Sequence, residues 1–106
     1  MIAPLAALIR YHEIYSEAPA AEETPFRLSE KTRLLQAMDQ NLHRRYLKMH
    51  RRHGISTVVP MERGICTGCH MRQPSRPNLV EEDIYECQNC GRFLYDPDVA
   101  YEYNVG

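Results

Sequence analysis

The sequence contains no tryptophan and only two phenylalanines, so most of its aromatic surface comes from seven tyrosines. No apolar run approaches the roughly 18 to 20 residues that a membrane span requires. The apolar stretch 1–9 lacks the preceding basic residue of a secretory signal. We therefore expect a cytoplasmic protein with no membrane contact. A chain of 106 residues has room for only a small core, and such chains often depend on a metal or on oligomerisation.

Catalytic patterns are missing as well. The sequence has no glycine-rich phosphate loop and no recognisable nucleophile–base pair. The acidic run 81–83 is typical of a charged loop before a strand, because no apolar surroundings that would form a pocket are visible beside it. We expect no enzymatic activity and no small-molecule substrate.

Charge is unevenly distributed along the chain, although the net charge is only -1. Residues 1–26 carry -3, and residues 77–106 carry -6. Residues 27–76 hold eleven lysines and arginines against three acids, which gives +8. The basic middle therefore says more about partners than the overall pI does.

The four cysteines form two Cys-x-x-Cys pairs, Cys66/Cys69 and Cys87/Cys90, with seventeen residues between the pairs. Two residues between cysteines allow one tight turn to aim both sulfurs at one point, and two such turns supply a tetrahedron of thiolates. No cysteine is left over. The pattern predicts one structural zinc ion, because four thiolates leave no open position for substrate or water.

Other uses of these cysteines are less consistent with the sequence. Cys66-x-x-Cys69-His70 matches the c-type haem attachment pattern, but that chemistry needs export and would leave the second pair unexplained. A thioredoxin-like pair needs a βαβ context that is absent. A four-thiolate iron site uses the same ligands, so spacing alone leaves zinc and iron both open.

Apolar periodicity predicts a helical region over residues 1–54. A short helix is expected at 2–15, a linker at 16–28 and a long basic helix at 29–53, with Gly54 as its stop. Thr24-Pro25 is an alternative start for the long helix. The apolar stripe of this helix comprises Leu28, Leu35, Met38, Leu42, Tyr46 and Met49. Such a stripe needs the first helix or a second chain to cover it.

After Gly54, β-branched and alternating residues predict strands at 55–59, 83–87 and 92–95. Pro60 would end the first of them. Residues 55–96 would form the metal-binding unit. Residues 97–106 are an acidic tail for which no regular structure is expected. The fold class is therefore small α+β.

The C-terminal half resembles a known family in several motifs. They are Val58-Val59-Pro60, Gly64-Ile65-Cys66-Thr67-Gly68-Cys69-His70-Met71, Pro74, Ile84, Cys87-Gln88-Asn89-Cys90-Gly91-Arg92 and Leu94-Tyr95. Together with Arg45-Tyr46 they are similar to the C4-type zinc ribbon domain of bacterial coiled-coil proteins, over about residues 33–96. The resemblance implies a three-stranded ribbon with two zinc knuckles, and a nucleic-acid-binding or adaptor role. The helical region here is shorter than is usual in that family.

Basic side chains gather on the predicted long helix and near the first cysteine pair. The candidate phosphate contacts are Arg44, Arg45, Lys48, Arg51, Arg52, Arg63, Arg72 and Arg76. One hypothesis is an accessory or regulatory protein that binds RNA or DNA through these residues. The alternative is a protein–protein adaptor that uses the apolar stripe to dimerise or to bind a partner. A solvated basic helix face is the plainest interpretation of the same residues.

Overall fold

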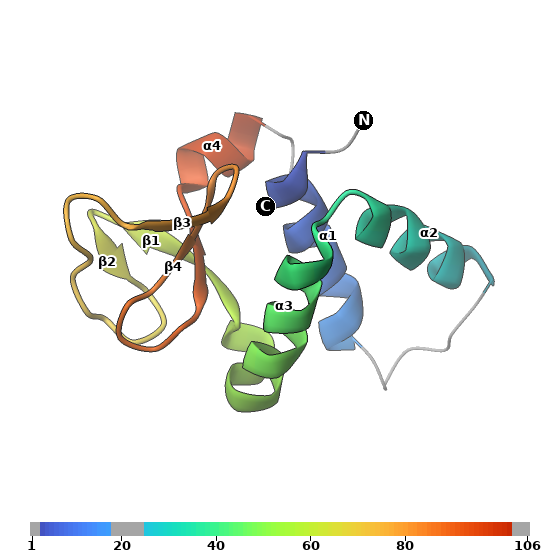
Figure 1. Ribbon diagram of the computed structural model, residues 1–106, viewed down its shortest axis with the longest axis horizontal. Helices are drawn as coiled ribbons and strands as arrows, with labels where there is room; N and C mark the ends of the chain where they lie inside the picture. Colours follow the sequence, from blue (N-terminus) through green and yellow to red (C-terminus); the bar gives the residue numbers. More distant parts are fainter. Residues whose placement is uncertain (1–2, 18–24, 103–106) are drawn as a thin grey trace.

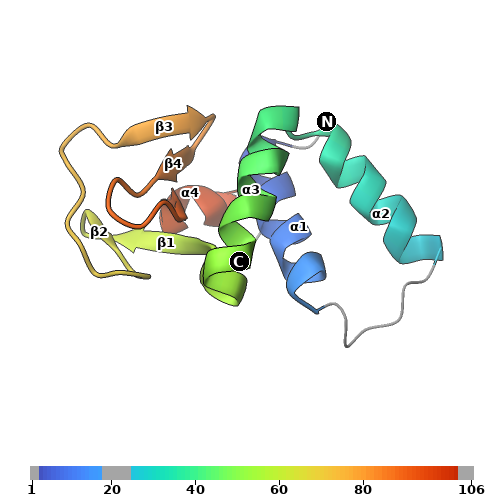
Figure 2. The ribbon, with the colours of Figure 1, turned by 60° about the horizontal axis from the view of Figure 1, so that its bottom comes forward.

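A helical unit and a β unit lie side by side in the computed structural model, which describes residues 3–17 and 25–102 (Figures 1 and 2). The helical unit comprises α1 (Pro4–Glu17), α2 (Pro25–Gln36) and α3 (Gln40–His53). The β unit, residues 58–95, contains β1 (Val58–Glu62), β2 (Ile65–Cys66), β3 (Asn78–Glu81), β4 (Ile84–Glu86) and β5 (Phe93–Tyr95). A short 3-10 turn, Gly54–Ser56, joins the units, and α4 (Pro97–Glu102) follows the sheet.

The predicted first helix is present, at Pro4–Glu17 and not at 2–15, and it covers the third. Leu5, Leu8 and Leu42 are each 1% exposed or less within one apolar cluster. Tyr46 of α3 is fully buried, and its ring packs edge-on against the ring of Tyr11. Met38, Leu42 and Tyr46 of the predicted stripe are thus covered within the same chain, whereas Leu28 is half exposed.

The prediction of one long helix over 29–53 is wrong, because the chain breaks between α2 and α3. Tight i→i+3 hydrogen bonds from the amides of Ala37 and Met38 close α2. Asp39 then caps α3: its backbone is extended, and its carboxylate accepts a 2.7 Å hydrogen bond from the amide of Asn41. Met38 lies at the break and is buried, and Leu35 before it and Leu42 after it contact the same apolar cluster. The apolar spacing therefore stays regular across the break.

The boundaries around this break also differ from the expected ones. The second helix begins at Pro25, the alternative start, so only part of the predicted linker at 16–28 lies between helices. Residues 18–24 of that linker fall outside the described part of the chain. Gly54 ends α3 as predicted, with φ of 58° and its amide bonded to the carbonyl of His50.

The sheet has five strands in the order β2-β1-β5-β4-β3, so the expected three-stranded sheet is wrong in number. Strands β4 and β5 confirm two of the predicted segments. The strand predicted at 55–59 is displaced, because residues 54–56 form the 3-10 turn and β1 begins at Val58. It also runs through Pro60, which pairs with Tyr95 of β5 in parallel. The two strands that were not predicted, β2 and β3, are short. A two-residue turn joins β2 to β1, and another joins β3 to β4.

The acidic segment after the sheet is partly helical, contrary to the expectation for 97–106. Asp96 caps α4 by accepting a 2.9 Å hydrogen bond from the amide of Asp98, with Pro97 at the first helical position. The Asp-Pro pair that ends β5 therefore also begins a helix. Residues 103–106 lie outside the described part.

The sheet is buried on both sides in different ways. Ile84 and Phe93 are 1% exposed or less and belong to the apolar cluster of the helices. Leu94 is fully buried in a second cluster that contains Cys66 and Cys87. One face of the sheet thus packs against the helices, and the other face packs against the cysteines. No helix within the described ranges is long and apolar enough to cross a bilayer.

Candidate metal centre

Two short turns with matching backbone geometry position the cysteines. In the first knuckle (66–71) the amide of His70 donates to the carbonyl of Cys66 at 2.7 Å, and the amide of Cys66 donates to the carbonyl of Met71. In the second knuckle (87–92) Gly91 donates to Cys87 at 3.0 Å, and Cys87 donates to Arg92. The fifth residue has positive φ in both: 64° at His70 and 80° at Gly91.

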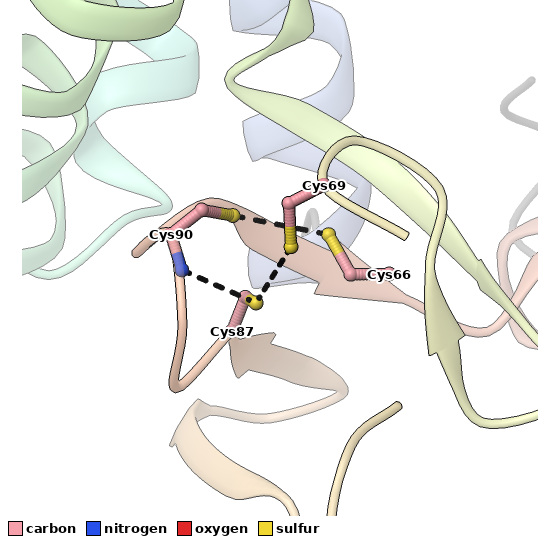
Figure 3. A group of neighbouring side chains, drawn as sticks. All are labelled: Cys66, Cys69, Cys87 and Cys90. Carbon is pink, nitrogen blue, oxygen red and sulfur yellow. Dashed lines mark hydrogen bonds between the residues drawn. The ribbon is translucent and has the colours of Figure 1, made fainter. Parts of the chain in front are cut away.

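The four sulfurs converge on one point between the knuckles (Figure 3). The Sγ atoms of Cys66 and Cys90 are 3.9 Å apart, and those of Cys69 and Cys87 are 3.6 Å apart. All four lie within 4.8 Å of one another. Sulfurs at the corners of a tetrahedron with metal–sulfur bonds of about 2.3 Å would be about 3.8 Å apart. The cluster can therefore hold a metal ion with all four thiolates as ligands.

The thiols are not equally easy to ionise. Burial raises the pKa of the Cys66 thiol to about 12 and also raises the pKa of Cys90. At Cys69 burial opposes ionisation too, but hydrogen bonds from Met71, Asn89 and the neighbouring thiols outweigh it and lower the pKa to about 6. Four thiolates this close need a cation between them. A divalent ion supplies that charge and displaces the remaining protons.

Arg92 crosses between the two knuckles and explains the glycine at position 68. Its Nε donates to the carbonyl of Ser56 at 2.9 Å, which anchors the guanidinium to the turn after α3. A Cβ on Gly68 would stand 2.6 Å from the Nε of Arg92. Gly68 has no positive φ, so its backbone conformation does not require glycine. Space for Arg92 is the reason, whereas Gly91 does adopt the left-handed conformation.

Gln73 contacts the site and has no counterpart in the sequence-based prediction. It is 7% exposed, and its side-chain amide lies 3.3 Å from the Sγ of Cys87. A glutamine in a loop rich in proline and arginine carries no pattern that marks it as buried. Only the register of the loop against the second knuckle shows it.

The C-terminal end of α3 contacts the second knuckle. His53 Nε2 is 2.9 Å from the carbonyl oxygen of Cys90. His50 instead contacts Ser16 and the ring of Tyr15, so the two histidines point to different partners. Within residues 3–17 and 25–102, the four cysteines are the only group of three or more His, Cys, Asp or Glu that could share a metal.

The basic residues predicted to bind phosphate fall into two groups. Five of them are exposed on α3: Arg44, Arg45, Lys48, Arg51 and Arg52. At 3.6 residues per turn they lie within roughly 120° of one another, on the face opposite Leu42 and Tyr46. Arg45 forms an ion pair with Glu86 of β4.

Arg63, Arg72 and Arg76 are exposed but belong to other surfaces. Arg63 lines a shallow cleft with Asp96 and Asp98. Arg72 and Arg76 lie in the loop that joins β2 to β3, which runs along the side of the sheet away from α3 in both ribbon views. The structure thus brings together the five helix residues and does not bring the other three to them.

The sequence matches no protein-family model and no curated protein. Among solved structures, the fold is similar to that of the HP0958 protein from Helicobacter pylori, with a TM-score of 0.54 and 23% sequence identity. The similarity covers 67% of this chain and 31% of that chain. The chain therefore spans about a third of the length of its structural relative, and the likeness concerns the fold.

Proposed function

We propose that this chain is a cytoplasmic zinc-binding accessory protein that binds RNA or DNA through the outward face of α3. The supporting observation is the exposed basic face: five basic side chains within one helix, only one of which, Arg45, has a carboxylate ion-pair partner among the described residues. Phosphate backbones bind such surfaces through charge and release counterions.

Zinc is the proposed occupant of the four-cysteine cluster, because zinc favours closed tetrahedral thiolate sites. A filled tetrahedron offers no position for substrate, so the metal would stabilise the β unit and take no part in catalysis. This architecture also supports membership of the C4-type zinc ribbon family. The β unit would then hold the C-terminal end of α3 in place through the contact between His53 and Cys90.

A salt-dependent binding assay tests the proposal. We expect a short fluorescent RNA or DNA to bind the zinc-loaded protein with an affinity that falls steeply with salt. Changing Arg44, Lys48 and Arg51 to glutamine should reduce the slope of log affinity against log salt by roughly 2 to 3, at about 0.7 to 0.9 per lost phosphate contact.

A matched control carries three glutamines at Arg63, Arg72 and Arg76, which removes the same charge from other surfaces. This control should keep most of the affinity and the slope. Equal losses in both triple variants would show that net charge matters and the α3 face does not. An affinity that is flat across salt would remove the nucleic-acid proposal altogether.

The adaptor alternative retains one supporting observation. Met38 and Leu42 of the predicted stripe are buried against the chain itself, so they are not available to a partner. On α2, however, Phe26 is 78% exposed and Leu28 is 51% exposed. If α2 pairs with a second copy, sedimentation should show a dimer that Phe26→Ser dissociates. A monomer at high concentration would exclude this self-pairing.

A further inference from the structure

Apart from tyrosines and cysteines, Gln73 is one of two buried polar side chains in the described part of the chain, the other being Thr57. Burial of a carboxamide costs free energy unless its polar atoms are hydrogen-bonded. Gln73 meets this requirement. Its Nε2 donates to the carbonyl of Met71 at 3.0 Å and to the Sγ of Cys87 at 3.3 Å, and its Oε1 accepts from the amide of Gln88 at 3.3 Å.

The partners also determine which end of the carboxamide is which. The amide of Gln88 can only donate, so the atom facing it must be the oxygen. The carbonyl of Met71 can only accept, so the atom facing it must be the nitrogen. A flipped side chain would lose both bonds, and the N–H directed at Cys87 follows from this orientation.

These bonds connect segments that are distant in sequence. Met71 closes the first knuckle, while Cys87 and Gln88 begin the second. The backbone amide of Gln73 adds a 2.7 Å bond to the carbonyl of Gly64, in the turn before β2. One residue therefore ties the turn before the first cysteine pair to both knuckles.

Cys87 is a ligand that benefits from such a donor. It is 2% exposed, and its Sγ also lies 3.5 Å from the amide of Cys90. Four thiolates around a divalent ion leave two uncompensated negative charges. N–H donors that face a buried sulfur stabilise this excess charge, as outer contacts do around metal ligands generally.

We propose that Gln73 is a positioning residue of the metal centre, which aligns the two knuckles and donates a hydrogen bond to the Cys87 thiolate in the metal-bound protein. The inference rests on the proposed metal site. It adds that the site depends on a side chain outside the four ligands, and that removing this side chain weakens metal binding while every ligand remains.

Zinc affinity, measured by competition with a chromogenic chelator, tests the inference in the full chain. Gln73→Met keeps the length of the side chain and removes both donor and acceptor, and we expect it to weaken zinc binding about ten- to a hundredfold. Gln88→Met makes the same chemical change beside Cys87 on an exposed side chain, whose backbone amide alone contacts Gln73. This control should bind zinc within about twofold of the unchanged protein, because it removes no hydrogen bond to a metal ligand.

A second measurement uses the unchanged sequence, so it does not depend on a variant that folds. In protein loaded with ¹¹³Cd and labelled with ¹⁵N, a side-chain amide proton of Gln73 should exchange slowly and show scalar coupling to the metal through the sulfur of Cys87. A purely structural glutamine would show slow exchange without that coupling.

The outcomes separate the two claims. Failure of the unchanged chain to bind zinc or cadmium would overturn the proposed metal site itself. Normal metal binding by the unchanged chain, together with equal affinity in Gln73→Met and no coupling to ¹¹³Cd, would overturn the role of Gln73 alone. Equal weakening in Gln73→Met and Gln88→Met would also overturn it.

Discussion

The helical unit and the β unit are stabilised by different means. The helices bury large apolar side chains such as Leu5, Leu8 and Leu42 against one another. On the cysteine side of the β unit, the buried residues are Cys66, Cys87 and Leu94. Where apolar side chains are few, a metal ion can replace the missing core, since its binding free energy becomes folding free energy.

Metal removal should show this difference most strongly. Zinc contributes roughly 10 to 16 kcal/mol of apparent binding free energy in zinc-finger peptides, which is as large as the whole stability of many domains. We expect a chelator to abolish amide-exchange protection across residues 58–95 and to leave much of the protection in α1 and α3. Hydrogen exchange read by mass spectrometry compares the two units directly.

Cys87→Ser should reproduce the same pattern without chelator, which separates metal loss from other effects of the reagent. Loss of protection at equal rates in both units would contradict the comparison. Ile84 and Phe93 share the apolar cluster of the helices, so some loosening at the interface accompanies the main effect.

A core deletion in the helical unit should give the converse result. Leu42→Ala removes a side chain that is 1% exposed, and we expect it to lower the free energy of unfolding by about 2 to 5 kcal/mol. Leu28→Ala is the matched control, because Leu28 is 51% exposed; its effect should stay within about 0.5 kcal/mol. Urea titrations followed by circular dichroism measure both. If the folded Leu42→Ala protein lost its metal, the two units would not be separable.

Acid should weaken the helical unit through its half-buried histidines. His12 Nε2 faces the carbonyl of Ile55 at 2.9 Å, and Nδ1 faces the hydroxyl of Tyr46 at 2.8 Å, which fits a neutral ring. Burial lowers the pKa of His12, and it also lowers the pKa of His43 and His50. The unfolded chain then binds protons more readily, so stability is complete above about pH 6.5 and declines as the pH falls below it.

Thermal unfolding followed by tyrosine absorbance between pH 8 and pH 5.5 checks this expectation. Metal release is recorded alongside, because protonation of thiolates also favours unfolding in acid. His12→Gln should be less stable at pH 8 and should show a flatter dependence on pH. A slope as steep as that of the unchanged protein would exclude His12 as a contributor.

The smallest effect is expected at the ion pair between the units. Arg45 of α3 meets Glu86 of β4, but their side chains are 45% and 25% exposed. Exposed pairs of this kind contribute about 0 to 1 kcal/mol. Glu86→Gln should therefore change the free energy of unfolding by less than about 1 kcal/mol, measured by the same urea titration. A loss of several kcal/mol would show that the units depend on this contact more than its exposure implies.

The four-cysteine cluster could be predicted from the sequence because cysteine spacing reports local turn geometry. Two residues between ligands are enough to specify each knuckle, and the knuckles have matching hydrogen bonds. The end of the helix at Gly54 could also be predicted, because a glycine with positive φ is a local signal of a helix C-terminus. Features determined within a few residues of chain were therefore predicted well.

Features that depend on contacts between residues distant in the sequence were not predicted. The stripe through Leu35, Met38 and Leu42 indicated one helix, because apolar spacing stays regular across a capped break when both sides face the same core. The parallel pairing of β1 with β5 joins segments more than thirty residues apart, and no local pattern reports it. Gln73 is the extreme case, because its role exists only once both knuckles are placed.

Metal content per chain, measured together with the state of the thiols, shows whether the four cysteines hold a metal that folds the β unit. We predict one zinc ion per chain in purified protein, with all four cysteines unreactive until a chelator removes the metal and the β unit unfolds. A preparation with no metal, four reactive thiols and a β unit that stays folded in chelator would show that the β unit folds without a metal.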